Sequence, residues 1–233
     1  MIVSQRAWAP PVRDGLGVGV AAGFAGLAFG TSAVTAGLSV AQASVLSVLA
    51  FTGASQFALV GVIAGGGNLA AGVVGAMLLG ARNTLYGLRL ADVLGWRGTR
   101  KIVATHGVID ESTAVALAQR DRDDARLGFA TTAVTTFVCW NVTTVVGAVA
   151  TGHVGDISAL GLDAVVPAVF LALLWSRLRH GGRERWVALG GVAIALATTT
   201  FLPAGVPVLC AAIAALVATL AASTRPTETS GGT

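Results

Sequence analysis

Polar residues that could bind a small solute interrupt the apolar segments of this sequence at a few places. The first is segment 51–57 (FTGASQF), in which Ser55 and Gln56 offer hydrogen-bonding groups and Gly53 weakens a helix. A helix broken here would expose backbone N–H groups able to hold an anionic group of a substrate. The alternative is that Ser55 and Gln56 bond a neighbouring helix, and the sequence leaves both interpretations open.

A second polar group, Arg82, Asn83, Tyr86 and Arg89, lies near the end of the third apolar segment. The guanidinium of Arg82 could grip a carboxylate, or it could extend to the membrane interface, as we expect for Arg89. In the fourth apolar segment, Asn141 needs a hydrogen-bonding partner. The candidate substrate-binding residues are therefore Gly53, Ser55, Gln56, Arg82, Asn83 and Asn141.

Three carboxylates are candidates for proton coupling. We expect Asp110 and Glu111 at the membrane interface, and Asp163 at the start of the fifth apolar segment. Acidic groups at such positions take and release protons in coupled carriers. The competing interpretation is an exposed carboxylate, or for Asp163 a carboxylate at a helix start, where the helix dipole favours it.

Signatures of other chemistries are missing. The glycines 65–67 are not followed by the Gly-Lys-Ser/Thr sequence of a phosphate-binding loop, so nothing indicates ATP as an energy source. No metalloprotease or serine-hydrolase motif occurs, and Cys139 and Cys210 are interpreted as small core residues. The basic residues form no face with interleaved aromatics. We therefore expect no enzyme, metal, cofactor or nucleic-acid partner.

The elements that position these residues must be membrane helices. Of the 233 residues, 55% are hydrophobic and 11% are charged, and the mean hydropathy is +0.79, whereas soluble domains carry roughly 25% charged residues. No charged residue occurs in 15–80, a stretch far longer than the about 20 residues that cross a bilayer. In lipid each segment must satisfy its own backbone hydrogen bonds, so each is helical or a broken helix.

The expected fold is an all-α integral membrane protein, a bundle of about seven transmembrane helices, some broken or short. The spans are 15–38, 43–64, 69–90, 127–151, 160–178, 186–201 and 204–222. They form a single domain over 15–222, with tails at 1–14 and 223–233. Glycines that recur every four residues, such as Gly15, Gly19 and Gly23, predict close packing between helices.

Loop charges predict the orientation of the spans. The connection 91–126 holds six basic residues and 177–185 holds four arginines, so both are expected in the cytoplasm. Three spans before the first of them would place Arg6 and Arg13 outside, against this rule. Either the N-terminus is outside nonetheless, or the second or third segment enters the membrane without crossing it. Seven crossings with the N-terminus outside is the preferred expectation.

The same segments carry a resemblance to a known family. They are 23–30 (GFAGLAFG), 51–57 (FTGASQF), Asn83-x-x-Tyr86, 110–112 (DES), and 161–163 (GLD) followed by 167–170 (PAVF). In this order they resemble the AzlC family, the large subunits of branched-chain amino-acid exporters, from Gly15 to the last apolar segment. The family often shows Asn-x-Arg in its third segment, where this sequence has Arg82-Asn83. The resemblance implies proton-driven export of leucine, isoleucine or valine from the bacterial cytoplasm, and a small AzlD-type partner subunit.

We therefore predict a multi-pass subunit of the bacterial inner membrane that exports branched-chain or similar apolar amino acids. Its site would hold the substrate carboxylate at broken-helix N–H groups near Ser55 and Gln56, and Gln56→Ala would abolish export. The residues alone leave two other functions open: a passive channel or permease for another small polar solute, and a membrane scaffold that transports nothing.

Overall fold

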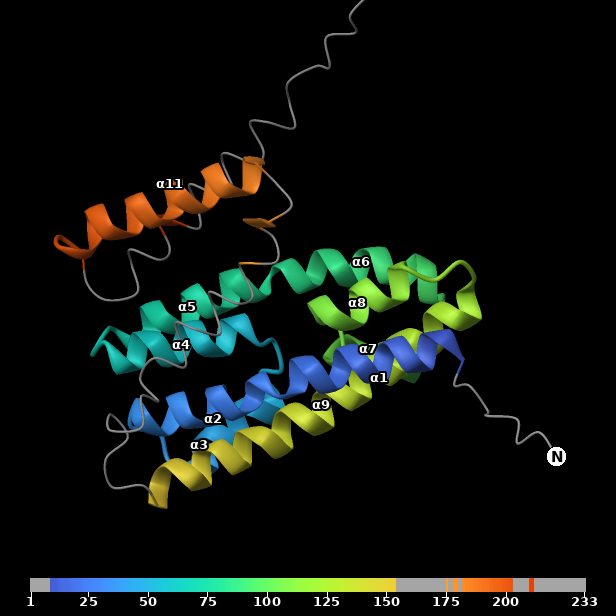
Figure 1. Cartoon of the computed structure of the whole chain (residues 1–233), viewed down its shortest axis with the longest axis horizontal. Coiled ribbons are helices and arrows are strands. Elements are labelled where there is room, and N and C mark those ends of the chain that lie inside the picture. The colour runs from blue at the N-terminus through green and yellow to red at the C-terminus, as the bar shows by residue number, and fades with distance from the viewer. Residues whose placement is uncertain (1–8, 154–174, 176–177, 180–181, 203–209, 212–233) are drawn as a thin grey trace, which may run out of the picture.

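The structure, a computed structural model, describes residues 9–153, 175, 178–179, 182–202 and 210–211. Every regular element in this described part is a helix, which confirms the all-α class, and the helices form an elongated bundle (Figure 1). They are α1 (Pro10–Gly23), α2 (Ala25–Thr35), α3 (Val40–Leu49), α4 (Ala54–Ala64), α5 (Leu69–Gly80), α6 (Arg82–Leu94), α7 (Gly98–His106), α8 (Asp110–Leu117), α9 (Arg122–His153) and α11 (Gly182–Thr199). Asp163 lies outside the described residues, as do most of the expected spans 160–178 and 204–222.

Two long helices form the centre of the bundle. The first consists of α1 and α2, interrupted only at Phe24, and covers Pro10–Thr35; the second is α9. Within the described residues, Pro10–Thr35 and Arg122–Thr151 are the two helices long and apolar enough to cross a membrane. They lie side by side and run in the same direction (Figure 1).

Glycines bring these two helices into close contact, as their spacing predicts. A Cβ atom at Gly19 would lie 2.8 Å from Cβ of Thr135, and one at Gly30 would collide with the backbone carbonyl of Thr144. Small residues at such a crossing let two helix backbones approach closely. Glycines later in α1–α2 contact residues later in α9, so the two helices run parallel.

The second apolar segment turns back inside the bundle. The chain breaks at residues 50–53, and Nε2 of Gln56 donates a hydrogen bond of 3.2 Å to the carbonyl oxygen of Leu46. Residues ten apart in one continuous helix would be separated by about 15 Å, so the chain reverses between α3 and α4. α3 is only about 15 Å long, which is half the thickness of a bilayer core of roughly 30 Å. α4 then packs antiparallel against α5, where Gly72 contacts Val62.

This reversal determines at which end of the bundle the N-terminus lies. With the second segment re-entrant, α1–α2 and the nearly continuous α5–α6 are the two passages before the basic connection. The start of α1 therefore lies at the same end as that connection, where a Cβ at Gly128 would be 3.6 Å from Cβ of Pro11 (Figure 1). This corrects the preferred expectation of an N-terminus on the opposite side. Arg13 lies at the end where positive charge is expected.

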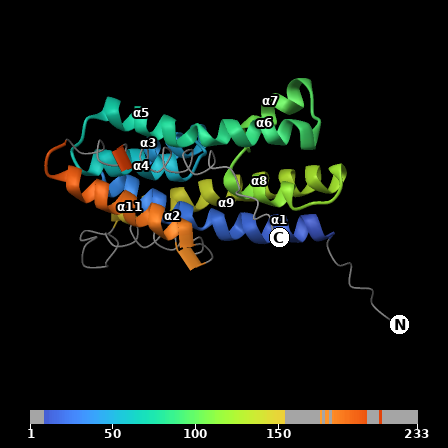
Figure 2. The ribbon, with the colours of Figure 1, turned by 90° about the horizontal axis from the view of Figure 1, so that it is seen from above.

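The basic connection is shorter and more helical than the expected loop 91–126. α6 continues to Leu94, α9 begins at Arg122, and α7 and α8 lie between them. No side chain of α7 is buried. α8, in contrast, buries Ser112 and Ala116 completely and lies between α6 and α1 (Figure 2).

Two apolar clusters hold the bundle together, and both pack against α9. In the first, which joins α2, α4 and α9, the ring of Phe29 stacks on Trp140 with centroids 6.0 Å apart and meets Phe57 edge-on at 5.6 Å. The second cluster joins α6, α8 and α9 around Leu90 and Phe129. These clusters fix α4 and α6 on either side of the broken segment.

Candidate functional site

The break between α3 and α4 depends on Gly53. This residue has φ +63° and ψ −94°, a conformation that residues with a Cβ rarely adopt. The hydroxyl of Thr52 donates to the carbonyl oxygen of Ala50 at 3.1 Å. The N–H groups of Ala54 and Ser55, in the first turn of α4, have no acceptor within their own helix. The break therefore presents carbonyl oxygens of one helix end and N–H groups of another, as segment 51–57 predicts.

Gln56 joins the two sides of the break. Its side chain is 1% exposed. Oε1 accepts a hydrogen bond from the N–H of Gly53 at 3.1 Å, and Nε2 donates to the carbonyl oxygen of Leu46 at 3.2 Å. Because both ends of this amide bond the protein itself, Gln56 determines the shape of the break.

Two buried polar atoms near the break have no hydrogen-bond partner among the described residues. One is Oγ of Ser55, which lies against α5, where a Cβ at Gly80 would be 3.2 Å away. The other is Nε1 of Trp140, whose ring lies 4.0 Å from the Cβ position of Gly53 and meets Phe57 edge-on at 6.1 Å. Buried polar atoms in native proteins nearly always find a partner. The two atoms therefore leave hydrogen-bonding capacity unused beside the break, although neither residue lines the cavity described below.

Asn141 has its hydrogen bonds satisfied between α3 and α9. Its Oδ1 accepts from the hydroxyl of Ser47 at 2.7 Å, and its Nδ2 donates to the carbonyl oxygen of Phe137 at 2.8 Å. Ser47 also contacts the hydroxyl of Thr144 at 3.3 Å. These are bonds between neighbouring helices, so the structure supplies the partner that the sequence showed Asn141 to need.

Arg82 and Asp110, which the sequence suggested as a substrate contact and a proton carrier, form an ion pair. Nη2 of Arg82 lies 2.7 Å from Oδ2 of Asp110, and each side chain is about one-third exposed. The other carboxylate oxygen of Asp110, and Oδ1 of Asn83, are buried without a hydrogen-bond partner. Two unsatisfied acceptors thus lie on the facing helices α6 and α8.

Glu111 follows Asp110 in the first turn of α8. Burial raises the pKa of its carboxyl above the ordinary value, and the neighbouring charge of Asp110 raises it further. A hydrogen bond to the backbone and the charge of Arg82 act in the opposite direction but do not cancel the rise. A carboxyl with a raised pKa takes up a proton more readily at neutral pH.

A cavity of about 440 Å³, here called the break cavity, lies beside the broken segment. One wall is the end of α3 with residues of the break, a second is one face of α5 and α6, and a third is α7. Its lining consists of Leu49, Ala50, Phe51, Thr52, Gly80, Asn83, Thr84, Gly87, Leu88, Ala91, Lys101, Thr105, His106 and Val108. The cavity therefore brings residues 50–52 of the break and Asn83 into one site. The other predicted substrate-binding residues, Gly53, Ser55, Gln56, Arg82 and Asn141, are not in its lining.

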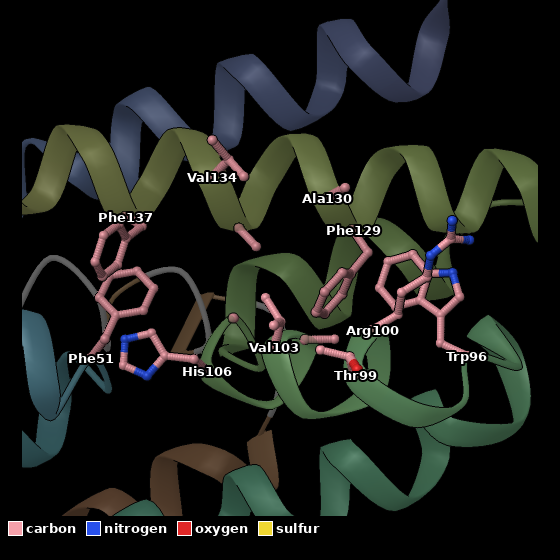
Figure 3. A pocket seen from close by; sticks show the side chains of 13 residues that line it. Phe51, Trp96, Thr99, Arg100, Val103, His106, Phe129, Ala130, Val134 and Phe137 are labelled. Atoms are coloured by element: carbon pink, nitrogen blue, oxygen red, sulfur yellow. The ribbon is translucent and has the colours of Figure 1, made fainter.

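A larger cavity of about 620 Å³, here called the apolar cavity, lies on the other side of α7 (Figure 3). Its lining consists of Phe51, Trp96, Thr99, Arg100, Val103, Ala104, His106, Gly107, Phe129, Ala130, Ala133, Val134 and Phe137. Phe51 and His106 line both cavities. Their rings, 6.0 Å apart, also meet Phe137, which lies 5.2 Å from Phe51 and 5.6 Å from His106. These three rings, from the break, α7 and α9, form the wall between the two cavities.

Sequence reasoning missed the part of the site that α7 supplies. Lys101, Thr105 and His106 line the break cavity, yet the sequence indicated no role in a site for this part of the connection 91–126. The periodic pattern of α7 is compatible with many placements, and only the reversal of the second segment brings the break next to this helix.

Long apolar helices and a broken helix beside a cavity are features that membrane carriers also have, where discontinuous helices form the solute site. The model of the AzlC family, described as AzlC protein, matches residues 17–154. This is more than half of the chain, and the chain belongs to the AzlC family. AzlC proteins are a family of membrane transport proteins that work in exporters with a small partner, not a family of enzymes. No curated protein and no solved structure matches the chain.

Proposed function

We propose that this chain is the transport subunit of a secondary exporter that moves branched-chain or similar apolar amino acids out of the cytoplasm. The observation that carries the proposal is that the break and Asn83, with its unsatisfied Oδ1, line the same cavity. Family membership supports the transport class. In this proposal the chain is a multi-pass protein of the bacterial inner membrane and works beside a small partner subunit of the AzlD type.

The break cavity receives the charged head of the amino acid. We expect the substrate carboxylate to extend past the lining residue Thr52 to the N–H groups of Ala54 and Ser55 at the start of α4, where the helix dipole favours a negative charge. The ammonium group binds the oxygen of Asn83 and the carbonyl oxygens at the end of α3, because unpaired carbonyls at a helix C-terminus favour a positive charge. Gly53 and Gln56 position both helix ends, and Asn141 holds α3 against α9.

The aliphatic side chain of the substrate points toward the apolar cavity. Leucine, isoleucine and valine gain about 0.8 kcal/mol for each CH₂ group that they bury. Phe51 and Phe137 line that cavity on the side of the break. A polar side chain would lose its hydration there without a partner, so the preference for apolar amino acids follows from the lining.

The carboxylates of Asp110 and Glu111 on α8 carry the protons of the transport cycle. The ion pair between Arg82 and Asp110 connects α6, a wall of the break cavity, to α8, and protonation of Asp110 would release Arg82. The buried Glu111 beside it is a second proton acceptor. Asp163, outside the described residues, stays a third candidate.

Export from proteoliposomes tests the proposal. The protein is reconstituted with its small partner, the vesicles are loaded with labelled leucine, and efflux is followed with and without an imposed proton gradient and after an uncoupler. Asn83→Leu should reduce efflux at least tenfold without lowering the unfolding midpoint, because its oxygen has no partner to lose. The matched variant Asn141→Leu breaks two hydrogen bonds and should lower the midpoint. Wild-type efflux that ignores the gradient, or normal leucine export by Asn83→Leu, would overturn the proposal.

A further inference from the structure

A third cavity, here called the loop cavity, lies where α6, α7 and α9 meet at the end of the bundle that carries the basic connection. Its volume is about 550 Å³. Its lining consists of Ala91, Asp92, Gly95, Trp96, Arg97, Gly98, Lys101 and Arg122. The lining is the most highly charged of the three cavities. It shares Ala91 and Lys101 with the break cavity and Trp96 with the apolar cavity, and its other residues take no part in the amino-acid site proposed above.

Cations dominate this cavity. Arg97, Lys101 and Arg122 line it together with a single carboxylate, Asp92. Elsewhere on this face Arg126 pairs with a carboxylate of its own helix. No carboxylate of the described residues lies within ion-pair distance of Arg97, Lys101 or Arg122. Three positive charges around one cavity repel one another, and an anion between them would relieve that repulsion.

The backbone around the cavity holds Arg122 in place. Nη2 of Arg122 donates to the carbonyl oxygen of Asp92 at 3.3 Å, which fixes the guanidinium at the end of α6. A Cβ at Gly95, where φ is +60°, would lie 2.9 Å from Nη1 of Arg122, so glycine leaves the room that this side chain occupies. α7 begins at Gly98 with no acidic residue in its first turn and no capping side chain, so its positive end also faces an uncompensated site.

We infer that the loop cavity binds a phosphate group. Two guanidinium groups, which match the oxygens of phosphate with paired N–H donors, and an ammonium group favour a multiply charged oxyanion. The group belongs either to the headgroup of an anionic lipid or to a soluble phosphate compound. A lipid source agrees with Trp96, which lines the cavity beside Arg97, because tryptophan is enriched at the level of the headgroups and basic residues there attract anionic lipids.

Phosphate binding here fixes α7, which no buried side chain of its own anchors. A phosphate between Arg97 and Lys101 of this region and Arg122 of α9 bridges the two elements. α7 is the wall between the break cavity and the apolar cavity, and Trp96 and Lys101 extend from the loop cavity to each of them. The phosphate therefore stabilises the closed wall of the amino-acid site. This effect on transport rests on the proposed function, whereas the binding itself does not.

Thermal unfolding in nanodiscs tests the binding. The purified full-length protein is placed in phosphatidylcholine alone, or in an equal mixture of phosphatidylcholine and phosphatidylglycerol. Inorganic phosphate or glycerol 3-phosphate is added to the first sample in separate runs. The anionic lipid should raise the unfolding midpoint by several degrees, and Arg97→Gln should remove most of that rise. The matched variant Arg89→Gln removes one exposed charge from α6 outside every described cavity lining, and should keep it.

Each outcome decides a part of the inference. If the soluble phosphates raise the unfolding midpoint and Arg97→Gln removes this rise, the result supports the site and identifies a soluble source. A rise with lipid alone, lost in the same variant, supports the site and identifies a headgroup. No rise with any of these anions, or an equal loss in Arg97→Gln and Arg89→Gln, overturns the site. Because unfolding is measured without a substrate, a failure of leucine export leaves this result unaffected.

Discussion

Replacing Gln56 by alanine removes both hydrogen bonds that cross the break. The half-buried N–H of Gly53 then loses its acceptor, whereas the carbonyl oxygen of Leu46 keeps its bond from the N–H of Ala50 at 3.0 Å. An orphaned buried donor costs about 1–3 kcal/mol, and the loss of a bond whose acceptor stays satisfied costs about 0.5–1.5 kcal/mol. We therefore expect Gln56→Ala to lower the free energy of unfolding by about 2–4 kcal/mol.

Thermal unfolding of the purified variant in nanodiscs measures this loss. For a chain of this length 1 kcal/mol shifts the midpoint by roughly 2–4 °C, so the expected fall is roughly 5–15 °C. Gln42→Ala is the matched control, because Gln42 occupies the same position of α3 and accepts from the N–H of Ser39 at 2.8 Å, but on the exposed surface. Its loss should cost about 0.5 kcal/mol. Equal midpoints for the two variants, with normal leucine export by Gln56→Ala, would refute the role of Gln56 at the break.

Three further outcomes follow from the structure. Gly30→Ala drives a Cβ into the carbonyl of Thr144 and should lower the unfolding midpoint by several degrees, whereas Gly17→Ala, with nothing within 4 Å, should leave it unchanged; equal midpoints would contradict the glycine contact. Asp110→Asn cannot carry a proton, so its leucine efflux should no longer respond to an imposed gradient; a wild-type response would exclude Asp110 as the carrier. Burial raises the pKa of Glu111, so the folded protein holds this proton more tightly than the unfolded chain, and stability is lost as pH rises through that pKa. Glu111→Gln should therefore flatten the fall of the midpoint as the pH rises above 4.5, the ordinary pKa of a glutamate carboxyl, and an unchanged slope would show that Glu111 contributes nothing to this fall.

The sequence predicted the helical class, the glycine contacts and the place of the break, because each depends on residues close together in the chain. Gly53 with Ser55 and Gln56 indicates a broken helix from local chemistry alone. The direction that the chain takes after the break depends on the bond between Gln56 and Leu46, which spacing does not encode. The expected side of the N-terminus was wrong for this reason. A segment that turns back and a segment that spans the membrane have equally apolar sequences.

The candidate site was predictable only in part for a similar reason. Asn83 and the break were identified separately, and only the folded chain shows that they line one cavity. The ion pair between Arg82 and Asp110 joins residues on α6 and α8 that no short motif connects. The contribution of Lys101 and His106 depends on the position of α7, which the packing of other helices determines. Long-range contacts of this kind have no signature in a single sequence.

Protection of an engineered thiol by leucine tests most directly whether an amino acid occupies the break cavity. In a protein whose Cys139 and Cys210 are replaced by alanine, Thr84→Cys places a thiol in the lining of that cavity, and Leu85→Cys places one on the next residue, outside every described cavity lining. Both positions are exposed. Saturating leucine should slow the reaction of Thr84→Cys with a small maleimide several-fold and leave Leu85→Cys unchanged. An unchanged rate for Thr84→Cys, in a variant that still exports leucine, would contradict the account.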